Sequence, residues 1–162
     1  MNAMTRISAV CACLAIPGAF AAKIDLVDYC DPTDPAWNPT GGCLLEEGDV
    51  TFAEFNALAS SVLSASVVGH PAWRMEPSYA DFDAGEKLRV RNKGGRVHSF
   101  TEVAQFGGGV IPGLNIGLTF APECASLVRV PPGQSIELQL APGLHLFQCC
   151  IHPWMRAAVR VE

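Results

Sequence analysis

The chain has 162 residues, of which 49% are hydrophobic and 17% are charged. This composition excludes a disordered chain and predicts one domain with a hydrophobic core. The formal net charge is −5, and the only basic run, Lys87–Arg91, alternates like a strand with one wet face, so nothing in the chain resembles a nucleic-acid-binding surface. Its 12 Pro and 15 Gly indicate many turns and favour strands over long helices.

The N-terminal residues have the pattern of a secretory signal peptide. Arg6 precedes an apolar run from Ile7 to Ile16, and Ala19-Phe20-Ala21 is a small-x-small cleavage motif. The run is too short to cross a bilayer as a helix, although a membrane anchor that is never cleaved is the alternative interpretation. We expect residues 1–21 to be removed and the mature chain to be secreted or periplasmic, with no membrane span.

Export would place the chain in an oxidising compartment, where the number of cysteines becomes informative. Five of the seven cysteines follow the predicted cleavage point: Cys30, Cys43, Cys124, Cys149 and Cys150. Because five is odd, two disulfides would leave one thiol that is free, shared between chains or bound to a metal.

Residues 22–61 are predicted to form an acidic extension, irregular over 22–48. Three Pro and a Gly pair between Cys30 and Cys43 exclude a helix or an inner strand, and a disulfide between these cysteines would close a compact loop. The acidic pairs raise the possibility of calcium, but the spacing of an EF-hand loop is absent. Thr51-Phe52-Ala53-Glu54 then fits a capping box and predicts a short helix from about 52 to 62.

From residue 62 onward the chain alternates short apolar runs with turns. The runs cover residues 62–68, 78–82, 88–92, 97–103, 134–140, 144–150 and 157–162. Seven or so strands within about 100 residues predict an all-β, Greek-key β-sandwich over 62–162. A Gly- and Pro-rich loop, 104–126, interrupts the series.

Three kinds of metal donor lie in one short segment near the C-terminus. His152 follows Cys149 by three positions and precedes Met155 by three, so thiolate, imidazole and thioether share a seven-residue loop. Two His and one Cys with a weak axial Met form the arrangement of a type 1 copper site. His98 follows a Gly-Gly turn and is the candidate for the second imidazole. Taken singly, Met155 could be a core residue, His98 a polar strand residue and Cys149 half of a disulfide.

The segments around these residues resemble the cupredoxin (blue copper protein) family. The run from Gly143 to Arg156 resembles the family's C-terminal copper loop, and its short Cys-x-x-His-x-x-Met spacing is most similar to amicyanin, pseudoazurin and plastocyanin. The run from Val90 to Phe100 resembles the strand-turn-strand that delivers the first histidine. The resemblance covers about residues 65–162 and leaves out the signal, the acidic loop and the helix.

The resemblance implies a ligand set for one copper ion that changes between Cu(I) and Cu(II). Cys149 would be the thiolate ligand, His98 and His152 the equatorial imidazoles, and Met155 the long axial ligand. Ser99 would lie where the family places a residue that hydrogen-bonds near the thiolate.

The resemblance also implies how a redox protein partner would bind. His152 would be the ligand nearest the solvent, and Pro153 and Trp154 would contribute to an apolar docking patch. His145 occupies a core position of the family strand and is interpreted as structural, while His70 has no sulfur neighbour and no assigned role.

Cys150 is assigned to a disulfide. As a ligand it would leave only one residue before His152, which fits the family poorly, and on a strand its side chain would point away from that of Cys149. We expect Cys150 to pair with Cys124, at the end of the Gly-rich loop. Together with the loop disulfide, this leaves Cys149 for the metal.

These observations predict an exported, monomeric one-electron carrier that is not an enzyme. Four histidines cannot supply the extra copper centres of multicopper oxidases or nitrite reductases, and the c-type haem motif is absent. A structural zinc site would not use Met155. The alternatives are a copper-binding protein for delivery or storage, and a partner-binding module whose metal site has lapsed.

Overall fold

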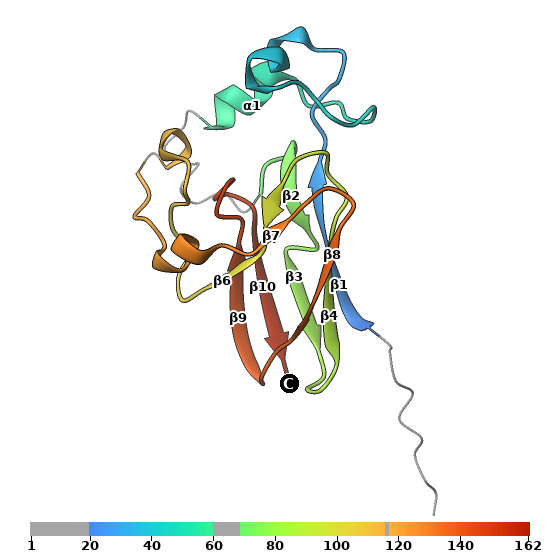
Figure 1. Cartoon of the computed structure of the whole chain (residues 1–162), viewed down its shortest axis with the longest axis vertical. Coiled ribbons are helices and arrows are strands. Elements are labelled where there is room, and N and C mark those ends of the chain that lie inside the picture. Colours follow the sequence, from blue (N-terminus) through green and yellow to red (C-terminus); the bar gives the residue numbers. More distant parts are fainter. Residues whose placement is uncertain (1–19, 60–68, 116) are drawn as a thin grey trace, which may run out of the picture.

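The computed structural model describes residues 20–59, 69–115 and 117–162. Two four-stranded sheets pack into a β-sandwich, which confirms the predicted fold class (Figure 1). The first sheet has the order β2 (Trp73–Glu76), β1 (Phe20–Asp28), β4 (Lys87–Asn92) and β8 (Ser135–Gln139). The second has the order β3 (Tyr79–Phe82), β10 (Arg156–Val161), β9 (Gly143–Gln148) and β6 (Thr101–Val103).

A two-stranded ladder of β5 (His98–Ser99) and β7 (Arg129–Val130) completes the strands. The helices are short: η1 (Pro35–Thr40), α1 (Phe52–Ala59), η3 (Pro112–Leu114) and η4 (Pro122–Ser126). Within the described residues, no helix has the length and apolar character needed to cross a membrane.

Most of the predicted strands form. Those expected over 78–82, 88–92, 134–140, 144–150 and 157–162 are β3, β4, β8, β9 and β10, and the run 97–103 is divided into β5 and β6. The strand expected over 62–68 and residues 1–19 of the predicted signal lie outside the described residues.

The prediction of irregular structure over 22–48 is wrong for its first part, because β1 is an inner strand of the first sheet. It pairs antiparallel with β2 and parallel with β4. Ile24 and Leu26 are fully buried, whereas the Asp25 carboxylate between them pairs with Lys23 and Lys93. This alternation is that of a half-buried strand, and the acidic composition of the segment obscured it. The sandwich therefore draws one of its inner strands from the predicted extension.

The remainder of the extension, residues 29–59, is here called the stapled segment. It lies at the end of the sandwich where β1 ends (Figure 1). The predicted Cys30–Cys43 disulfide closes its loop. The capping box also forms, since the Thr51 amide donates to Glu54 Oε2 at 2.9 Å and the Glu54 amide donates to Thr51 Oγ1 at 3.3 Å. The stapled segment is thus an ordered unit held to the end of β1.

The Gly-rich loop is attached to the segment that follows β9. A second disulfide joins Cys124 to Cys150, as predicted, and the Val110 amide donates to the Cys150 carbonyl at 2.7 Å. Gly109 lies so close to this carbonyl that a Cβ atom there would be 2.0 Å from the oxygen. The loop therefore folds against the backbone of Cys150.

Thiol counting tests this arrangement of cysteines. Among the described residues, Cys149 is the free cysteine and it is buried. We expect one reactive thiol when the chain from residue 22 onward is denatured without reductant and freed of metal. Three or more reactive thiols in that assay would contradict the two disulfides.

Candidate metal centre

The loop between β9 and β10 brings two of the predicted ligands together. Gln148 and Arg156 are paired across the two antiparallel strands, so the two ends of the loop between them lie side by side. The Cys149 amide donates to the Met155 carbonyl, and the Met155 amide donates to the His152 carbonyl, each at 2.9 Å. This tight closure holds Cys149 and His152 on one short turn.

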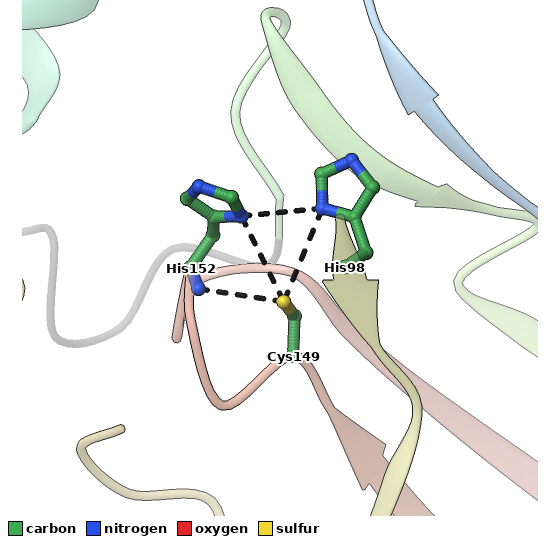
Figure 2. Close-up of side chains that lie close together, drawn as sticks. All are labelled: His98, Cys149 and His152. Carbon is green, nitrogen blue, oxygen red and sulfur yellow. Dashed lines mark hydrogen bonds between the residues drawn. The ribbon is translucent and has the colours of Figure 1, made fainter. Parts of the chain in front are cut away.

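His98 joins them from the neighbouring β5 strand (Figure 2). The two Nδ1 atoms of His98 and His152 are 3.2 Å apart, and Cys149 Sγ lies 4.0 Å and 3.8 Å from them, respectively. Metal bonds to imidazole and thiolate are about 2.0–2.3 Å long, so each pair of donors is close enough to contact the same ion. The three residues are therefore a candidate metal-binding group.

The centre is dry. His98 and Cys149 are 0% exposed and His152 is 8% exposed. Polar groups buried to this extent are costly unless they are paired or bind a metal. The burial of all three donors is consistent with a site built for an ion.

The sulfur of Cys149 is surrounded by groups that favour its thiolate form. Burial alone would raise the pKa of this thiol, but the His152 and His98 imidazoles outweigh burial and hold the pKa well below its ordinary value. The Ser99 and His152 amides also point at the sulfur, at 3.3 Å and 3.4 Å. A thiolate is the form of cysteine that binds metals.

Ser99 lies beside the sulfur of Cys149. Its amide contacts the sulfur, whereas its hydroxyl accepts a hydrogen bond from the Cys150 amide at 2.7 Å. Thr101 donates to the same hydroxyl at 3.3 Å. Ser99 therefore links β5 to the backbone of the loop between β9 and β10 as well as to the sulfur itself.

Asp28, at the end of β1, contacts the far side of the His98 ring. Its Oδ1 lies 2.5 Å from His98 Nε2, and its Oδ2 accepts from the Arg96 amide at 2.9 Å. Because a carboxylate only accepts, Nε2 carries a proton and Nδ1 faces Cys149 and His152. Gly94 makes room for the carboxyl, since a Cβ there would lie 2.5 Å from it.

The same contacts change the proton affinity of His98. Burial by itself lowers the pKa of this imidazole, but the hydrogen bonds to Asp28 and Cys149 outweigh it and raise the pKa to about 9. The raised pKa favours the protonated form of His98 in the metal-free protein.

Met155 ends the turn that holds Cys149 and His152. It is fully buried and belongs to the same hydrophobic cluster as Cys149 and Trp154. Its place in the turn is compatible with an axial ligand, and that role remains a prediction.

His152, at 8% exposed, is the most exposed of the four predicted ligands, but the predicted docking patch beside it does not lie at the surface. Pro153 and Trp154 are buried, so they do not form a patch on the surface. His152 is itself covered by Trp73, whose ring stacks on the imidazole with centroids 4.9 Å apart and planes at 18°. Rings of the stapled segment pack against Trp73 and Trp154 at the His152 edge of the centre. The sequence resemblance does not include the stapled segment, so it gave no indication that His152 would be covered.

The other two histidines lie outside the group. His145 Nδ1 is 2.6 Å from Glu102 Oε1 and its Nε2 is 2.8 Å from the Ala141 carbonyl, in keeping with a structural role. His70 is buried and its ring contacts Phe55, with centroids 5.1 Å apart.

Comparison with known proteins gives likenesses among solved structures. No protein-family model matches the chain, and no curated protein matches it. A purple cupredoxin from Nitrosopumilus maritimus is 15% identical, and the match covers 87% of this chain and 99% of that one with a TM-score of 0.44. A reduced amicyanin variant is 22% identical over 64% of this chain and 89% of its own, with a TM-score of 0.40. A second amicyanin variant, also reduced, is 20% identical over 54% of this chain and 71% of its own, with a TM-score of 0.37.

Proposed function

We propose that the protein is an exported one-electron carrier that holds a single type 1 copper ion through His98, Cys149, His152 and Met155. The observation that carries the proposal is the group of three buried donor atoms, each pair within reach of one ion. Bound there, copper would supply a Cu(I)/Cu(II) couple.

The chemistry of the donors favours copper. Thiolate and thioether sulfur with two imidazoles is the combination that suits copper in electron-transfer sites, whereas structural zinc sites use thiolate, imidazole and carboxylate. Met155 is the residue that distinguishes the two, because a thioether adds nothing to a zinc site.

The surrounding residues hold the donors in place before any metal arrives. Asp28 orients His98, the Ser99 amide contacts the sulfur of Cys149, and Trp73 stacks on His152. A site held in this way rearranges little when an electron arrives or leaves, which suits a carrier better than a protein that must release its ion.

A copper titration tests the proposal. Adding Cu(II) to the metal-free protein is expected to produce an intense blue, violet or green absorption from a copper–thiolate bond, with a matching EPR spectrum, and ascorbate should bleach it reversibly. His145→Gln is the matched control, because that histidine lies outside the group, and it should leave the colour intact. A colourless or slowly reduced complex would favour copper delivery or storage, and no binding would favour a partner-binding module.

The affinity for copper is expected to depend on pH. Because the pKa of His98 is raised to about 9, binding at lower pH must displace a proton from Nδ1. The apparent affinity should therefore rise by about tenfold per pH unit between pH 6 and 8 from this group. Competition with a chelator of known protonation behaviour measures it, and a flat profile would contradict the raised pKa.

A further inference from the structure

The His152 edge of the centre is covered by four aromatic rings, here called the aromatic lid: Trp37, Phe52, Phe55 and Trp73. Trp73 belongs to β2 and is the ring in contact with His152, at a centroid distance of 4.9 Å. It is 4% exposed, so its indole lies beneath further residues.

Rings of the stapled segment form the outer layer of the lid. The centroid of Phe55 lies 4.7 Å from that of Trp73 and that of Trp37 lies 5.5 Å from it, both in edge-to-face contact. Phe55 also reaches Trp154 of the metal loop, at 5.7 Å. Phe52 packs on the edge of Trp37 at 5.1 Å. The lid thus joins the stapled segment to the loop that carries two of the donors.

Several bonds hold the outer layer closed. Trp37 lies inside the loop closed by Cys30–Cys43, and its indole donates to the Val50 carbonyl at 3.0 Å. Asp34 accepts from the Phe52 amide at 2.8 Å, which ties this loop to α1.

Arg96 connects the lid to the strand that carries His98. Its guanidinium lies 5.7 Å from the centroid of Trp73. It also donates to the carbonyls of Thr40, at 3.0 Å, and Gly42, both in the stapled loop.

We propose that the aromatic lid closes the His152 edge against water and small ligands, and that Trp73 is the positioning residue that holds the His152 ring. The inference rests on the proposed function for the identity of the metal, but closure is a property of the protein alone. Closure implies that an electron exchanged at this edge crosses the Trp73 indole, because this ring stacks on the imidazole and only 8% of His152 is exposed.

Alkylation of Cys149 tests closure without any metal. In the native, metal-free full chain, the Cys149 thiolate displaces iodide from iodoacetamide, forming a carbon–sulfur bond, and mass spectrometry of the peptide containing Cys149 follows the rate. We expect slow alkylation of the wild type and at least tenfold faster alkylation of Trp73→Leu.

Phe82→Leu is the matched control for a general loss of stability. Phe82 is a buried aromatic residue on β3 and pairs with Val161, next to the C-terminal residue. The C-terminus lies at the end of the sandwich opposite the stapled segment (Figure 1). This variant should alkylate at the wild-type rate. If it accelerates as much as Trp73→Leu, or if Trp73→Leu keeps the wild-type rate, the lid does not control access.

The loop disulfide offers a second route to the same answer if Trp73→Leu does not fold. Cys30→Ser combined with Cys43→Ser releases the loop that holds Trp37 and leaves Cys149 unchanged. Its alkylation should also be at least tenfold faster than that of the wild type, and an unchanged rate would overturn the proposal.

In copper-loaded protein, azide should alter the spectrum of either lid variant but not of the wild type. Failure of copper to bind would count against the proposed function alone, since alkylation still reports on the lid.

Discussion

Replacing Cys149 with serine is expected to abolish the intense visible absorption of the copper-loaded protein and to lower copper affinity by more than about 100-fold. Loss of residues that only support a ligand costs about 10–100-fold, so loss of the thiolate itself should cost more. A serine hydroxyl is not ionised and is not a soft donor, so it replaces neither the bond nor its colour. Absorption and EPR spectra with equilibrium dialysis measure both effects.

The matched control for this substitution keeps the thiolate and removes other cysteines. Cys124→Ser combined with Cys150→Ser eliminates the neighbouring disulfide without touching Cys149. This double variant should retain the absorption band. If the band is lost in the control but kept in Cys149→Ser, the assignment of the adjacent cysteines is reversed.

The second large effect concerns Asp28. Replacing it with leucine removes the acceptor for both His98 Nε2 and the Arg96 amide. A buried donor left without a partner costs about 1–3 kcal/mol, so the free energy of unfolding should fall by at least about 2 kcal/mol. Copper affinity should fall by about 10–100-fold, because the orientation of His98 is no longer held. Denaturant unfolding and chelator competition give the two values.

Asp28→Asn separates charge from hydrogen bonding. Its amide oxygen can still accept from His98 Nε2, so copper should bind, but the lost negative charge no longer favours the more positive Cu(II) state. We expect a higher reduction potential. Asp25→Asn is the control on the same strand, because Asp25 pairs with Lys23 and Lys93. An equal shift in both variants would mean that the effect arises from net charge and not from contact with His98.

Local sequence patterns were sufficient to predict most strands of the sandwich and the two donors, Cys149 and His152, that share one loop. Alternation of apolar residues predicts β4 and β8, since each has one face toward the core. Cys149 and His152 are three residues apart in a turn closed by a single β-hairpin, so their spacing alone brings them together. The Pro- and Gly-rich loop between Cys30 and Cys43 and the position of Cys124 indicated the two disulfides, and the odd cysteine count indicated one remaining thiol.

The position of His98 next to Cys149 depends on the fold and not on local sequence pattern. The strand is visible in the sequence, but His98 and Cys149 are 51 positions apart and nothing in the intervening sequence specifies the distance between their side chains. That contact depends on the ladder of β5 with β7 and on the position of β9 in the other sheet. His98 was predicted as a ligand from the resemblance to a known family, because periodicity does not indicate which distant residues come into contact.

The contacts of Asp28 with His98 and of Trp73 with His152 depend on tertiary structure alone. Asp28 reaches His98 across 70 positions because β1 lies parallel to β4, and no local periodicity encodes which strands become neighbours. Trp73 covers His152 because β2 pairs with β1 and the stapled segment packs over both. The amino-acid sequence by itself determined the donors and their loop, since these depend on spacing within one turn. The closure of the site and the support of His98 come from contacts between distant segments, which exist only once the sheets have assembled.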